Sequence, residues 1–187
     1  MIQNQTSNCT FYNRHAKIFR ELTEITPNPS RILSFGCSTG KECETFHKIY
    51  FPDANIIGLD ISKEIIEENI KNNTFKQIEY FSNFEEIKEK FNLIFAMSVL
   101  CLWPEEENNK YTFETFSETL KQIDSLLEKD GYVCIYNSKY IFPETETFKK
   151  YKIIETENKE TGFVTKYHMN GDKIGKYPYF LFQKIED

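Results

Sequence analysis

The chain has 187 residues, a length that fits a single domain with a sizeable hydrophobic core. Its net charge of −6 argues against a strongly basic face for nucleic acid, and no apolar run approaches the ~20 residues that a membrane-spanning helix needs. The five cysteines form no Cys-x-x-Cys pair, which argues against a disulfide framework and a structural zinc site. Because its first residues show no signal-peptide pattern, the chain is expected in the reducing cytoplasm.

An amphipathic pattern within residues 1–29 predicts a helical lead-in. Its apolar residues at helical spacing are Ile18, Phe19, Leu22 and Ile25. Beyond the lead-in, short apolar runs alternate with helical patterns. Strands are predicted over residues 31–35, 55–60, 78–81, 92–98 and 132–137. Helices are predicted over residues 41–51, 62–73, 84–91 and 111–131.

Two of these helices carry signals at their ends. Ser62 is the expected N-cap of the helix over 62–73, and Gly131 is the expected C-cap of the helix over 111–131. The apolar face of the first helix comprises Ile65, Ile66 and Ile70. The stripe along the second helix comprises Phe113, Phe116, Leu120, Ile123 and Leu127.

Strands that alternate with helices predict right-handed crossovers and an α/β fold with a parallel sheet. The helical pattern fades after Asn137. Residues 151–157, 162–169 and 177–186 then read as strands, with a hairpin turn at 170–173. The sequence therefore predicts βα units followed by an antiparallel extension.

The loop after the first predicted strand is rich in small residues, with Gly36, Ser38, Thr39 and Gly40 in close succession. Ligands of open parallel sheets bind beyond the carboxyl ends of the strands, where this loop lies. Glycine there removes a Cβ that would keep a ligand away and permits unusual φ angles. The spacing Gly-x-x-x-Gly, followed by Lys41 and Glu42, is not that of a phosphate loop, so ATP is not favoured.

The second predicted strand ends in Asp60, 20 residues after Gly40. A carboxylate at that place accepts hydrogen bonds from the hydroxyls of a ribose. Asp60 can equally cap the following helix, or do both. A glycine-containing loop and a ribose-binding carboxylate at one sheet edge predict a nucleoside ligand, which leaves both NAD and S-adenosylmethionine open.

At this point the chain resembles the class I S-adenosylmethionine-dependent methyltransferases. FGCSTG (35–40) resembles their first motif, GLD (58–60) their second, and YPYFLFQKIE (177–186) their closing hairpin. The resemblance implies a Rossmann-like, doubly wound, mostly parallel seven-stranded sheet with an antiparallel last strand. It divides one domain, 1–187, into a lead-in (1–29), a cofactor-binding core (30–137) and an antiparallel C-terminal extension (138–187).

Within this class, the chain is most similar to the chemotaxis-receptor methyltransferases, which esterify glutamate side chains. Their Ser-Thr-Gly-Glu-Glu loop compares with STGKE (38–42), and their Asn-x-Thr-x-x-x-Arg element compares with NCTFYNR (8–14). FNLIFAMSVLCLWP (91–104) resembles their fourth-strand segment, and NSKYIF (137–142) the segment after their fifth strand. The likeness covers roughly residues 8–142.

This resemblance implies a set of cofactor-binding residues. Arg14, with Asn8 and Thr10 nearby, would pair with the methionine carboxylate, and Glu42 would receive the methionine amino group. Asp60 would bind the ribose, Asn83 and Phe84 would border the adenine, and Ser98 and Val99 would line the path to the methyl group. The expected set also includes Gly36, Cys37, Ser38, Gly40 and Ile61.

The acceptor side departs from the chemotaxis type. Ser98 stands where that type has Asn, and Leu102 stands where it has an aromatic residue. No Asp/Asn-Pro-Pro-Tyr motif suggests amino-methylation of DNA bases. Because methyl transfer needs chiefly alignment, no catalytic residue follows from the pattern. Candidates to line the acceptor pocket are Tyr12, His15, Cys101, Trp103, Asn137 and Tyr140.

The resulting hypothesis is an S-adenosylmethionine-dependent methyltransferase with an unidentified small-molecule or protein acceptor, and without nucleic-acid or membrane partners. One alternative is an S-adenosylmethionine-binding regulatory or scaffold protein without catalysis. A second, an NAD-dependent oxidoreductase, is disfavoured by the glycine spacing and by the pair Arg14 and Glu42.

Overall fold

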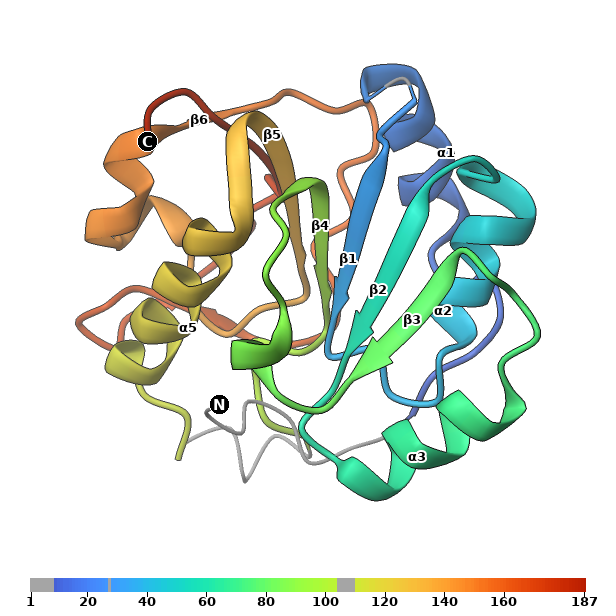
Figure 1. The fold of residues 1–187 in the computed structure, drawn as a ribbon. Helices are drawn as coiled ribbons and strands as arrows, with labels where there is room; N and C mark the ends of the chain where they lie inside the picture. Colours follow the sequence, from blue (N-terminus) through green and yellow to red (C-terminus); the bar gives the residue numbers. More distant parts are fainter. Residues whose placement is uncertain (1–8, 27, 104–109) are drawn as a thin grey trace.

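The computed structural model describes residues 9–26, 28–103 and 110–187. Its main sheet has seven strands in the order β3-β2-β1-β4-β5-β9-β6 (Figure 1). The strands are β1 (Arg31–Phe35), β2 (Asn55–Leu59), β3 (Ile78–Phe81), β4 (Phe91–Met97), β5 (Leu127–Tyr136), β6 (Tyr151–Ile153) and β9 (Leu181–Lys184). Strand β9 runs antiparallel to both neighbours, and the first five strands pair in parallel. The predicted mostly parallel sheet with an antiparallel last strand is confirmed.

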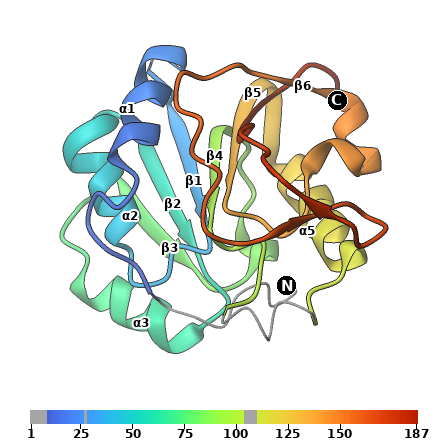
Figure 2. The same ribbon diagram turned by 180° about the vertical axis from the view of Figure 1, so that it is seen from behind.

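Helices cover both faces of this sheet. They are α1 (Ala16–Ile25), α2 (Lys41–Thr45), α3 (Lys63–Asn72) and α5 (Phe113–Leu126). One buried cluster joins α1, α2 and α3 to one face, and a second joins α5 to the other, as Figures 1 and 2 show from opposite sides. Neighbouring residues of β1 divide between the clusters, since Ile32 belongs to the first and Leu33 to the second. Burial on both faces explains why the central strands read as continuous apolar runs.

Short turns complete the chain between these elements. They are the π-helical turn η1 (Phe46–Tyr50) and the 3-10 turns η2 (Phe84–Glu86), η3 (Phe142–Glu144) and η4 (Glu146–Lys150). Two short strands, β7 (Lys166–Tyr167) and β8 (Lys173–Ile174), form a separate antiparallel hairpin. Gly171 turns this hairpin with a φ of 90°, as predicted for 170–173. The strands predicted over 151–157, 162–169 and 177–186 are all shorter than expected.

The predicted helix over 84–91 was wrong. Only Phe84–Glu86 form a 3-10 turn, and β4 begins at Phe91. The segment is too short and too highly charged to repay the cost of nucleating a helix, and Ile87 is its one buried side chain before that strand.

Gly131 is not the C-cap of α5. That helix ends at Leu126, and Leu127 already belongs to β5. Gly131 lies within β5, where the register with β4 shifts between Phe91 and Leu93. A Cβ on Gly131 would lie 2.9 Å from the Glu128 carbonyl oxygen, so this irregularity requires glycine.

The face predicted for α3 is confirmed only in part. Ile66 is buried, whereas Ile70 is 56% exposed. Ser62 occupies the N-cap position but makes no side-chain capping bond. In α5, the predicted Phe116, Leu120 and Ile123 are buried. No helix among the described residues has the length and apolar character needed to cross a membrane.

Candidate functional site

The carboxyl ends of β1, β2, β4 and β5 meet at one edge of the sheet, and the loop 36–40 follows the first of them. Gly36, Ser38 and Gly40 have φ angles of 79°, 49° and 73°. The N–H groups of Gly36 and Cys37 both donate to the carbonyl of Leu59, at 2.7 and 3.0 Å. This loop is therefore fixed to the end of β2.

The two glycines of this loop make room for the protein itself. A Cβ on Gly36 would lie 2.4 Å from Cγ2 of Val99, and one on Gly40 would lie 2.5 Å from the Tyr80 hydroxyl. Close packing within the chain is thus one reason for glycine at both positions. Val99 packs in the core beside Gly36, and Cys37 is also buried.

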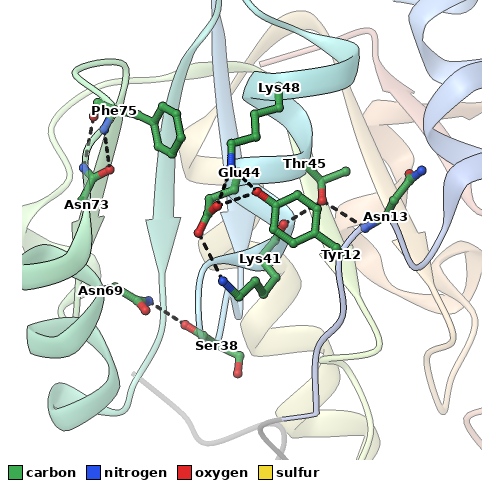
Figure 3. A network of polar contacts seen from close by, with 10 residues as sticks. All are labelled: Tyr12, Asn13, Ser38, Lys41, Glu44, Thr45, Lys48, Asn69, Asn73 and Phe75. Carbon is green, nitrogen blue, oxygen red and sulfur yellow. Dashed lines mark hydrogen bonds and ion pairs between the residues drawn. The ribbon is translucent and has the colours of Figure 1, made fainter.

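Asp60 ties the loop to the start of α3. Its Oδ2 accepts from the Ser38 N–H at 2.8 Å, and its Oδ1 accepts from the Ser62 N–H at 3.0 Å. The Ser38 carbonyl in turn accepts from Asn69 Nδ2 at 2.7 Å (Figure 3). Each carboxylate oxygen of Asp60 has a second lone pair, which leaves capacity for a hydroxyl donor such as a ribose. The helix-capping role and the expected ribose role are thus compatible.

Ile61 and the two expected adenine neighbours, Asn83 and Phe84, differ in their surroundings. Ile61, directly after Asp60, is 40% exposed. Asn83 caps η2, since its Oδ1 accepts from the Glu85 N–H at 3.1 Å. Phe84 is partly buried and packs against the cluster under α5. These residues follow the adjacent strands β2 and β3, so all three lie at the same sheet edge.

Glu42 places a carboxylate beneath this edge. It lies in the first turn of α2, and its Oε1 accepts from the Ser34 hydroxyl of β1 at 2.7 Å. Burial raises the pKa of Glu42 to about 7, although the Ser34 hydrogen bond and the Arg14 charge act to lower it. Among the described residues, no lysine, arginine or histidine forms an ion pair with Glu42. Its negative charge is therefore incompletely compensated.

Arg14 approaches Glu42 from the lead-in. Its Nη1 donates to the Cys9 carbonyl and its Nε donates to His15 Nε2, both at 2.9 Å. Because His15 accepts at Nε2, its proton is assigned to Nδ1. Burial and the Arg14 charge lower the pKa of His15 to about 4, and its ring contacts Tyr136 with centroids 4.9 Å apart. Neutral His15 thus orients the Arg14 guanidinium.

A clamp of polar contacts holds the lead-in against α2 (Figure 3). The Tyr12 hydroxyl donates to Glu44 at 2.5 Å and accepts from Lys48 at 2.5 Å. The Asn13 N–H donates to the Thr45 hydroxyl at 3.0 Å. This clamp fixes the backbone directly before Arg14.

Thr10 and Asn8 are the other two members of the expected lead-in element. Thr10 is partly buried, and Asn8 lies outside the described residues.

At the ends of β4 and β5, Ser98 and Asn137 face one another. Their φ angles are 58° and 57°, and Asn137 Nδ2 donates to Ser98 Oγ at 3.0 Å. The Ser98 N–H also donates to the Tyr136 carbonyl at 2.9 Å. Because His15 contacts Tyr136, this corner adjoins the residues that hold Arg14.

Several residues expected in an acceptor pocket have other surroundings. Tyr12 belongs to the clamp, and His15 orients Arg14. The Tyr140 hydroxyl donates to the Tyr111 carbonyl at 3.1 Å, and Cys101 is buried with its Sγ 3.7 Å from the Ser98 carbonyl. Trp103, by contrast, is 42% exposed.

Sequence reasoning missed two contributors to this edge. Ser34 supports Glu42, and a lone hydroxyl in the apolar run RILSF was a signal for it. Phe163 lies beside Trp103 with ring centroids 5.1 Å apart, and nothing local in the sequence indicates that neighbour.

Comparison with known proteins identifies a family for the chain. Residues 28–183 match the family model described as "Methyltransferase domain". Over 86 residues, the chain is 37% identical to "Probable thiol methyltransferase 2" of Arabidopsis thaliana. That match covers 42% of this chain and 36% of the plant protein, so the chain spans about a third of that relative's length.

A solved structure shares the fold. The ribosomal protein L11 methylase of Lactobacillus delbrueckii subsp. bulgaricus superposes with a TM-score of 0.57 at 17% identity. The match covers 95% of this chain and 81% of that one. The plantazolicin methyltransferase BpumL, in complex with SAH, gives a TM-score of 0.46 at 20% identity over 62% of this chain and 41% of its own. The former likeness supports the observed fold.

Proposed function

Since the chain belongs to the methyltransferase-domain family, we propose that it transfers a methyl group from S-adenosylmethionine to a small-molecule or protein acceptor. The observation that carries the proposal is the carboxylate of Glu42, which lies beneath the carboxyl edge of the sheet without an ion-pair partner among the described residues. An α-ammonium group offers a positive charge and three hydrogen-bond donors, which matches what this carboxylate lacks.

The remaining residues fit the other parts of the same molecule. Arg14, beside Glu42, suits the α-carboxylate of a methionine moiety, because guanidinium groups bind carboxylates with two parallel hydrogen bonds. Asp60 suits the ribose hydroxyls, and the exposed Ile61 suits an adenine face. The proposed site also includes Asn8, Thr10, Gly36, Cys37, Ser38, Gly40, Asn83, Phe84, Ser98 and Val99.

We further propose that the amino-acid end of the cofactor is held as in the chemotaxis-receptor methyltransferases. The support is local, since the lead-in that carries Arg14 is clamped to the helix that carries Glu42. In this division, the lead-in 1–29 contributes to the site together with the cofactor-binding core 30–137, and residues 138–187 form the antiparallel C-terminal extension. The likeness concerns the cofactor segments and leaves the acceptor unnamed.

When bound, S-adenosylmethionine supplies a methyl group activated by a positively charged sulfur. The chain then has to hold the acceptor in line and keep water out. Glu42 and Arg14 fix the amino-acid end, and Asp60 fixes the loop that carries Ser38. With a pKa near 4, His15 is neutral at physiological pH and is too weak a base to take a proton there.

Calorimetric titration with S-adenosylhomocysteine tests the cofactor part of the proposal. Wild-type protein should bind it, and Arg14→Ala should weaken binding about tenfold or more, since hydrogen bonds between charged groups contribute about 1.5–3 kcal/mol. Arg20→Ala is the matched control, because Arg20 is an exposed arginine on α1. Absence of binding by the wild-type protein would refute the proposal, and binding without methyl transfer to any extract fraction would refute its catalytic part.

A further inference from the structure

Three residues in left-handed conformations meet in a corner beyond β4 and β5. They are Ser98, Asn137 and Gly162, with φ angles of 58°, 57° and 79°. Such conformations are costly for residues other than glycine and persist where the surroundings enforce them, often at functional sites. The corner contacts Tyr136 through the Ser98 N–H and thereby adjoins the proposed cofactor site.

Asn137 holds this corner together. Its side chain is buried, with 1% of the residue exposed. Its Nδ2 donates to Ser98 Oγ at 3.0 Å, and its Oδ1 accepts from the N–H groups of Phe163 and Val164, both at 2.9 Å. A Cβ on Gly162 would lie 2.4 Å from that same oxygen. One amide therefore joins the loop after β4 to a segment that is distant in the sequence.

The two segments joined by Asn137 each carry an exposed aromatic ring. Trp103 is 42% exposed and Phe163 is 65% exposed, and their rings meet edge to face at 5.1 Å and 85°. Phe163 is anchored through its own N–H, so this exposed ring stands on a fixed backbone. A third flat ring can stack on one member of such a pair while meeting the other at its edge.

We propose that Trp103 and Phe163 form the wall of the acceptor subsite, that the methyl acceptor is a flat aromatic compound, and that Asn137 is the positioning residue of this wall. The inference rests on the proposed methyltransferase function and specifies its substrate class. An aliphatic acceptor of the same size would bury similar area but would gain none of the ring–ring geometry.

The single tryptophan of the chain allows a direct test. Protein saturated with S-adenosylhomocysteine is titrated with benzyl alcohol and with cyclohexylmethanol, while the fluorescence of Trp103 is recorded. Benzyl alcohol should give a saturable change at concentrations at least threefold lower than cyclohexylmethanol. Phe163→Leu should weaken the binding of benzyl alcohol about threefold to tenfold, the range expected for loss of an aromatic pair. Ile70→Ala, an exposed apolar change on α3, should leave both affinities unchanged.

A second variant tests Asn137 through its neighbour. Gly162→Ala should displace Phe163 and thereby weaken the binding of benzyl alcohol. The affinity for S-adenosylhomocysteine should stay as in the wild type. The proposal is overturned if benzyl alcohol gives no saturable change, if cyclohexylmethanol binds equally well, or if Phe163→Leu has no effect. If S-adenosylhomocysteine itself fails to bind, the proposed function fails, whereas a Phe163-dependent benzyl alcohol response would still support an aromatic site.

Discussion

The Ser34 hydroxyl lies 2.7 Å from Glu42 Oε1 and joins the penultimate residue of β1 to the first turn of α2. This hydrogen bond holds a carboxylate where burial raises its pKa to about 7. The same residue is therefore electrostatically unfavourable in the ligand-free protein and well suited to receive a cation. Glu42 is accordingly expected to lower the stability of the ligand-free protein and to favour the binding of a ligand with a cationic group.

Glu42→Gln should stabilise the ligand-free protein at pH 8 and have little effect at pH 5. The folded-state pKa lies above the ordinary value of 4.5, so the folded protein binds more protons, and stability falls as pH rises from about 4.5 through about 7. Glutamine removes this loss, worth about 2 kcal/mol after allowance for partial exposure. Thermal unfolding at the two pH values measures it, and a stabilisation of equal size at pH 5 would contradict the account.

Binding of S-adenosylhomocysteine should release protons near pH 7. An ammonium group beside Glu42 favours the ionised carboxylate, so affinity should fall as the pH is lowered below about 7, by up to tenfold per unit. Calorimetry in buffers of different ionisation enthalpy counts the protons. Glu42→Gln should bind weakly and release fewer protons, and an unchanged proton count in this variant would show that another group titrates.

Asp60→Ala should reduce both stability and cofactor affinity. The carboxylate accepts two backbone N–H groups, and removing it leaves both donors unsatisfied, at a cost of about 1–3 kcal/mol. Ser62→Ala is the control, since the Ser62 hydroxyl makes no capping bond to α3. Chemical denaturation and S-adenosylhomocysteine titration give the two readouts. Equal effects of both variants would rule out the special role of Asp60.

Thr45→Val should weaken S-adenosylhomocysteine binding by loosening the lead-in. The Thr45 hydroxyl accepts from the Asn13 N–H at 3.0 Å, and valine keeps the volume without the acceptor. Losing one such hydrogen bond costs about 1 kcal/mol, which corresponds to a roughly fivefold weaker affinity for S-adenosylhomocysteine. Thr23→Val on α1, where the hydroxyl donates only to the Arg20 carbonyl of the same helix, should leave the affinity unaltered. If Thr45→Val binds S-adenosylhomocysteine as tightly as the wild type does, the clamp does not contribute to the proposed cofactor site.

Asp124→Asn should destabilise the fold without changing cofactor affinity. The Asp124 carboxylate accepts a hydrogen bond from the Tyr151 hydroxyl at 2.8 Å. It also forms an ion pair with the buried Lys184 ammonium at 3.0 Å. Burial alone would raise the pKa of Asp124. The hydrogen bonds from Tyr151, Lys184 and Lys150 outweigh this effect and hold the pKa below its ordinary value of 3.8. The stabilisation is therefore present above about pH 4 and is lost on acidification.

The expected cost of Asp124→Asn at pH 7 is about 1–3 kcal/mol, because Lys184 then keeps only the more distant carboxylate of Asp187 and the carbonyls of Asp124 and Leu127. The difference from wild type should shrink towards pH 3. Glu146→Gln, in a fully exposed pair with Lys149, should show no measurable change in denaturant unfolding. A pH-independent difference for Asp124→Asn would contradict the electrostatic explanation.

The βα order, the approximate positions of the parallel strands and the sheet edge near Gly36, Glu42 and Asp60 could be predicted from the sequence alone. These features are local, because apolar runs, helical spacing and a residue that directly follows a strand are properties of neighbouring positions. The errors also have local causes. The 84–91 segment had a helical pattern but too little apolar surface to pack, and Gly131 imitated a helix C-cap while serving a bulge in β5.

The side-chain partners of these residues, by contrast, became visible only in the folded protein. Local pattern does not show that Ser34 faces Glu42, that His15 orients Arg14, or that Val99 and Tyr80 fill the space beside the loop glycines. The corner beyond β4 and β5 is the clearest case, since Asn137 and Phe163 are joined across 26 positions of the chain. Such contacts depend on how the strands are ordered and how the C-terminal segment folds back on them, and no short stretch of sequence contains that information.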